Sequence, residues 1–133
     1  MFFGKAKKWE DDIKRLQNNE ITIEELVNAN EKKVLYYSTP FVSDEKGDRP
    51  NVLQTEGSDV MFFPAFTSIS DLKEHMTAIG CEKHIVVKGD LKSVLDSLDS
   101  HPLIREWGVV IDPHSRQSIG IPPHVRVQPK CLR

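Results

Sequence analysis

The chain has 133 residues, with 18 basic and 20 acidic side chains and a formal net charge of -2. This length suits one domain that buries roughly two-thirds of its unfolded surface around a single core. The nearly balanced charge gives no global field that would recruit nucleic acid, and apolar runs such as VMFF are much shorter than a membrane span. We therefore expect a soluble cytoplasmic protein with no nucleic-acid or membrane partner.

Two short helices are predicted at the start of the chain. Trp9, Ile13 and Leu16 recur on one helical face among charged residues. Thr22 precedes Glu25 by three positions, which is the spacing of a capping box, and it opens a second helix. Together they predict a helical hairpin, whose apolar stripe we expect to dock on the rest of the domain or on a second copy of it.

From residue 34 onward the patterns alternate between strand and helix. Strands are predicted in VLYYSTPFV, VMFF, HIVVK, WGVVID and SIGIP, and helices in SDLKEHMTAIG and LKSVLDSL. The charged segment SDEKGDRPN is predicted to be an exposed loop, and the turn DPHSRQS is predicted to join the last two strands as an antiparallel hairpin. The expected fold class is α/β or α+β, a mixed β-sheet with helices packed on it. We divide the single compact unit into an N-terminal helical hairpin (1–33) and an α/β domain (34–133).

The stretch VMFFPAFTSISDLKEH runs a strand through a turn into a helix, an arrangement that can bind phosphate at the helix N-terminus. Here Ser68 or Ser70 can accept hydrogen bonds from the first helical turn, and Ser68 with Asp71 has capping-box spacing. Asp71 also places negative charge where an anion would lie, so the sequence favours a helix cap over an anion site. Pro64 is predicted to bend or end an edge strand, because proline cannot donate a ladder hydrogen bond.

No catalytic, metal or cofactor site is predicted. No two of the five histidines have the i, i+4 spacing of a helical zinc site, so we interpret them as surface residues. Ser115 and Ser118 lie near an aspartate and a histidine, but the G-x-S-x-G motif is missing. Cys81 and Cys131 are isolated thiols, typical of a reducing compartment, and a bridge between them stays open. Cys81 is predicted to be a small core residue.

The order of VLYYSTPFV, a charged loop, DVMFFPAFTSISDLKEH, HIVVKGDLKSVL and WGVVIDPHSRQSIGIPPHV resembles the N-terminal domain of the SseB family, named for enhanced serine sensitivity. The most telling segments are FPAFTS before a helix and the late GVVIDP turn. The resemblance covers about residues 34 to 127 and leaves the helical hairpin outside. The family has no established reaction, so the resemblance implies a fold and supplies no catalytic residue.

A binding role is therefore predicted. The segment WGVVIDPHSRQSIGIPP places Trp107, His114 and Arg116 around one hairpin, and Trp and Arg are enriched where proteins anchor partners. The alternative, that Trp107 is a core residue and Arg116 only solvates the turn, stays open. We predict a non-catalytic regulatory or adaptor-type module for an unidentified protein partner, with a homo-oligomer also open.

The second hypothesis is a small-molecule sensing domain for an amino acid or a nucleotide. A pocket between the sheet and the N-terminal hairpin would be lined by Tyr36, Tyr37 and Phe62. The sequence contains no convergent set of polar residues that identifies a ligand.

Overall fold

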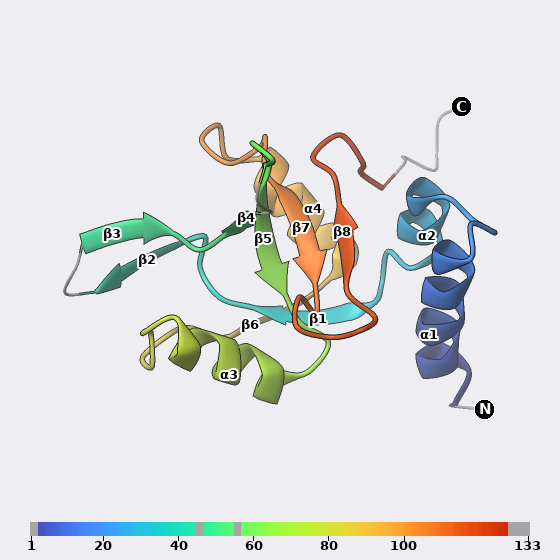
Figure 1. The fold of residues 1–133 in the computed structure, drawn as a ribbon, viewed down its shortest axis with the longest axis horizontal. Helices are drawn as coiled ribbons and strands as arrows, with labels where there is room; N and C mark the ends of the chain where they lie inside the picture. The colour runs from blue at the N-terminus through green and yellow to red at the C-terminus, as the bar shows by residue number, and fades with distance from the viewer. Residues whose placement is uncertain (1–2, 45–46, 55–56, 128–133) are drawn as a thin grey trace.

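The computed structural model describes residues 3–44, 47–54 and 57–127 (Figure 1). Along the chain the elements are α1 (Phe3–Gln17), α2 (Ile23–Ala29), β1 (Val34–Tyr37), β2 (Phe41–Asp44), β3 (Gly47–Pro50), β4 (Leu53–Gln54), β5 (Met61–Ala65), α3 (Ile69–Ala78), β6 (Val87–Asp90), α4 (Leu91–Asp99), β7 (Gly108–Ile111) and β8 (Ile119–Ile121). Helices and strands both build the fold, which confirms the α+β prediction.

The central sheet is mixed, as predicted. Its strand order is β4-β5-β7-β8, with β5 and β7 parallel and the other neighbours antiparallel. The last two strands form the predicted hairpin, because Val109 pairs with Ile121 and Ile111 with Ile119. Beside this sheet, β1 pairs with β6 and β2 with β3, both antiparallel. Among the described residues, β8 therefore lies at one edge of the central sheet (Figure 1).

The prediction that SDEKGDRPN is a loop is wrong. The segment contributes the end of β2 and all of β3, which pair from Phe41 with Pro50 to Asp44 with Gly47. Within this pair the Ser43 hydroxyl donates to the Asp48 carboxylate. Pairing with the neighbouring strand outweighs the weak strand preference of glycine, aspartate and proline.

The strand predicted in HIVVK, residues 84–88, is observed further along the chain as β6. Its register with β1 runs from Val34 with Asp90 to Tyr37 with Val87, and β1 ends there. Ile85 and Val86 therefore have no β1 residue opposite them, and their side chains are 61% and 38% exposed. β6 therefore begins at the residue that pairs with the last residue of β1.

Pro64 lies within β5, which is an interior strand, so the prediction that it belongs to an edge strand is wrong. Pro64 nevertheless limits the pairing between β1 and the chain at the end of β5. Tyr36 and Phe66 exchange both backbone hydrogen bonds, at 2.7 and 2.8 Å. Such pairs recur every second residue of an antiparallel ladder, so the next would join Ser38 to Pro64, which has no N–H. The ladder between β1 and the end of β5 stops for this reason.

One large apolar cluster joins the central sheet, α4 and the two N-terminal helices. α1 supplies Trp9 and Ile13, α2 supplies Leu26 and Val27, and none of the four is more than 4% exposed. Figure 1 shows α1 and α2 together on the β8 side of the molecule. The apolar stripe of α1 thus packs into the same core as the sheet, as expected from its spacing.

A smaller cluster lies between α3 and the end of β5. It contains Phe66, Leu72, Met76 and Cys81, with Val42 of β2. Cys81 is a free thiol that is 7% exposed, which confirms its prediction as a core residue, whereas Cys131 lies outside the described residues. No helix in the described part of the chain is long and apolar enough to cross a membrane.

Candidate functional site

The turn before α3 is a helix cap. Ser68 has extended backbone angles, with φ -134° and ψ 138°, and its hydroxyl accepts a hydrogen bond from the Asp71 N–H at 3.2 Å. The Ser70 hydroxyl lies 2.9 Å from the Ser68 hydroxyl. The cap predicted from the sequence is therefore confirmed, with Ser68 as the capping residue.

Replacing Ser68 by alanine is expected to lower the free energy of unfolding by about 0.5–2 kcal/mol, because the Asp71 N–H loses its side-chain acceptor. Ser70→Ala is the matched control, since Ser70 is exposed and does not cap; its effect should stay within about 0.5 kcal/mol. Urea unfolding of the two variants measures the difference. Equal losses for both serines would contradict the assignment of Ser68 as the cap.

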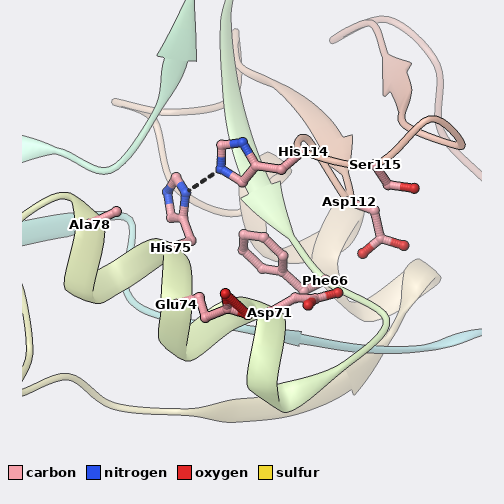
Figure 2. Close-up of a pocket in the computed structure, with 8 residues that line it drawn as sticks. All are labelled: Phe66, Asp71, Glu74, His75, Ala78, Asp112, His114 and Ser115. Atoms are coloured by element: carbon pink, nitrogen blue, oxygen red, sulfur yellow. Dashed lines mark hydrogen bonds between the residues drawn. The ribbon is translucent and has the colours of Figure 1, made fainter.

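A cavity of ≈ 370 Å³ lies between α3 and the turn that follows β7 (Figure 2). Its lining comes from both elements and from the end of β5: Phe66, Asp71, Glu74, His75, Ala78, Asp112, His114 and Ser115. Three carboxylates and two imidazoles therefore line one depression, and neither lysine nor arginine is among these lining residues.

Asp112 positions the turn of residues 112–118. Its backbone is left-handed, with φ 52°, a conformation that aspartate tolerates better than most residues. Its carboxylate accepts from the Thr67 N–H at 2.8 Å and from the Thr67 hydroxyl at 2.7 Å, and its own N–H donates to the Ala65 carbonyl at 2.9 Å. These bonds hold the start of the turn against the chain that enters α3.

His75 and His114 meet inside the cavity. His75 Nδ1 lies 3.0 Å from His114 Nε2, so that one ring donates and the other accepts. His75, on α3, is 4% exposed, whereas His114, on the turn, is exposed. Figure 2 shows the two rings beside Phe66, and the centroid of the His75 ring is 5.3 Å from that of each neighbouring ring. The pair joins the helix to the turn.

The surroundings of His75 favour its neutral form. Burial, and then the charge of His114, lower the pKa of His75 from its ordinary value of 6.5. His75 therefore binds a proton more readily in the unfolded chain than in the folded one. As the pH falls below 6.5, this difference lowers the free energy of unfolding.

The serine of the cavity forms a hydrogen bond within its own turn. The Ser115 hydroxyl accepts from the Gln117 N–H at 3.0 Å, which occupies it within the turn. No group of three or more His, Cys, Asp or Glu side chains in the described ranges is arranged to hold a metal ion. What the geometry offers is a recess whose carboxylates and imidazoles can form hydrogen bonds and whose carboxylates can attract positive charge.

The three predicted site residues lie in two places. His114 and Arg116 share the turn after β7, and both are exposed. Trp107 precedes β7 at its other end, is 7% exposed, and packs on the Phe41 ring with 5.6 Å between centroids. The structure places His114 and Arg116 on one turn and Trp107 in the core.

His75 is the site residue that sequence reasoning missed, and its interpretation as a surface histidine is wrong. One signal was available. Leu72, His75 and Met76 follow the i, i+3, i+4 spacing of one helical face, and all three are buried. That spacing could have predicted burial of His75, but its contact with a residue 39 positions away has no local signature.

The residues of the predicted small-molecule pocket have separate surroundings. Phe62 lines a second cavity of ≈ 350 Å³ on the outer face of the sheet, beside Val110 and Gly120. The Tyr37 ring packs edge-on against Phe63, whereas Tyr36 packs against the cluster under α3. These three aromatic residues do not line one pocket.

Comparisons of the chain with protein-family models, with curated proteins and with solved structures find no match. The resemblance to the SseB family stays a prediction based on the segments quoted above.

Proposed function

We propose that this chain is a non-catalytic, SseB-like protein-binding module of regulatory or adaptor type that acts in the cytoplasm. Its contact surface is the turn of residues 112–118 together with the β8 edge. One observation carries the proposal: an exposed turn leads directly into the edge strand of the central sheet. Edge strands offer unpaired backbone groups to an added strand, and nearby side chains supply specificity.

Arg116 is the polar anchor of this surface. Its planar guanidinium can bind a partner carboxylate through two parallel hydrogen bonds. The turn that carries it is held in place, because the Arg116 carbonyl accepts from Gln17 Nε2 of α1 at 3.3 Å and Asp112 is bonded to Thr67. Because the backbone of the turn is already held, it loses little conformational freedom on binding.

Arg116→Ala is expected to abolish or strongly weaken capture of the partner while the free energy of unfolding stays within about 0.5 kcal/mol of the parent. The measurement is a pull-down from the native host with the intact chain as bait, followed by a binding titration with the captured protein. Arg105→Ala is the matched control, because Arg105 is also an exposed arginine but lies outside the turn.

Unchanged affinity in the Arg116 variant would remove the turn as the contact surface. The exposed side of the two N-terminal helices would then become the better candidate. If the bait captures a second copy of this chain, the partner is that copy and the complex is a homo-oligomer.

The second candidate function is sensing of a small ligand, which the ≈ 370 Å³ cavity favours because it lies within the usual size range of ligand sites. The carboxylates of Asp71, Glu74 and Asp112 repel phosphate, so the lining suits the ammonium group of an amino acid better than a nucleotide. A thermal-shift screen of amino acids and nucleotides separates the two functions. A ligand that raises the melting temperature of the parent but not of Asp71→Asn would favour sensing.

A further inference from the structure

Two side-chain links hold the turn of residues 112–118 against the region of α3. The first joins Asp112 to Thr67 through two hydrogen bonds. The second joins His114 to His75 across 3.0 Å. They differ chemically, because the second depends on how many protons two imidazoles carry.

The histidine bond survives one extra proton but not two. In the neutral pair one ring supplies an N–H and the other a lone pair. If one ring becomes an imidazolium, it can still donate to the lone pair of the neutral ring. If both rings are protonated, each facing nitrogen carries a hydrogen, no acceptor remains, and two positive charges lie about 3.0 Å apart.

The surroundings of His75 disfavour the doubly protonated pair. Asp71 and Glu74 from α3 and Asp112 from the turn line the same cavity and are the charged groups nearest the pair in its lining. The state with two protons requires a charged His75, which is 4% exposed and lies against the Phe66 and His114 rings. Burial, and then the charge of His114, lower the pKa of His75 from its ordinary value, so both effects disfavour the doubly protonated pair.

We propose that His75 and His114 form a proton-operated latch, which holds the 112–118 turn on α3 while the pair carries at most one extra proton and releases the turn when it carries two. Release of the turn would also move Arg116, which the turn carries. An effect of this movement on partner binding rests on the proposed function. The latch itself is a property of the isolated chain.

The experiment is an NMR titration of the intact chain, without partner and with a chelator present, from about pH 7.5 to about pH 4.5. Imidazole nitrogen signals follow the two protonation steps. The amide chemical shifts of Ser115 and Ser118 report the surroundings of the turn, whereas the bonds of these N–H groups to the carbonyls of Asp112 and Ser115 lie within the turn and can survive its release. We expect the chemical shifts of both amides to change together with the second imidazole step.

The informative variant is His114→Gln. A glutamine amide reaches about as far as Nε2, can donate or accept, and does not titrate in this range. The turn should therefore stay closed throughout the titration. His124→Gln is the matched control, since His124 is exposed on the loop after β8, and it should release the turn as the parent does.

Three results would overturn the latch. The first is a parent turn whose amide chemical shifts do not change at the second imidazole step. The second is release of the turn in His114→Gln at the same pH as in the parent. The third is release of the turn at the pH at which the Thr67 amide signal changes and not at the second imidazole step. Because the Thr67 N–H donates to the Asp112 carboxylate, that result would assign the release to protonation of Asp112. None of these depends on a partner, so failure of the latch and failure of the contact surface in the Arg116→Ala experiment are distinguished.

Discussion

A chain that lacks residues 1–33 is expected to lose cooperative folding and to aggregate. The deletion removes Trp9, Ile13, Leu26 and Val27 from the main core, where each is at most 4% exposed. Burial of each such side chain stabilises a domain by roughly 1.5–3 kcal/mol. Together they approach the whole net stability of an ordinary domain, about 5–15 kcal/mol.

The same deletion also removes backbone acceptors at the start of α4. The Leu91 N–H donates to the Lys33 carbonyl and the Lys92 N–H to the Glu31 carbonyl, both at 2.9 Å. Solubility and the thermal unfolding transition, followed by circular dichroism, measure the outcome. In the intact chain, Ile13→Ala should be strongly destabilising, whereas Lys14→Ala on the exposed face of α1 should be nearly neutral. A truncated chain as soluble and stable as the parent would show that the domain does not need α1 and α2.

Trp107→Ala is expected to cost about 3–5 kcal/mol of unfolding free energy, a large part of the total. The indole is 7% exposed and belongs to the main core, so its removal leaves a cavity that the short segment before β7 cannot easily fill. Its contact with the Phe41 ring, 5.6 Å between centroids, is lost as well. Urea unfolding of the purified variant measures the change.

Leu103→Ala is the matched control for this truncation. Leu103 lies four positions before Trp107 and is 74% exposed, so its loss should stay within about 0.5 kcal/mol. If Trp107→Ala proved as mild as Leu103→Ala while partner binding fell, the tryptophan would belong to the contact surface, and its place in the core would be contradicted.

Local chemistry in the sequence was sufficient wherever a few neighbouring residues decide the structure. Thr22 and Glu25 form the predicted capping box, and Ser68 caps α3. α3 ends just before Gly80, whose φ of 87° suits glycine, as its position in the sequence indicated. These features depend on side chains within three or four positions of the backbone groups they satisfy, so the sequence determined them by itself.

Tertiary structure decided what depends on pairing between distant segments. The β2–β3 hairpin, the register of β6 against β1 and the interior place of Pro64 follow from which strand lies alongside, which local preference cannot specify. The candidate site also depends on contact between distant segments. His114 was named from the sequence, but its partner His75 lies 39 positions away on another element. Only folding brings α3 beside the turn after β7, because the contact arises from packing over the end of β5 and not from any spacing in the chain.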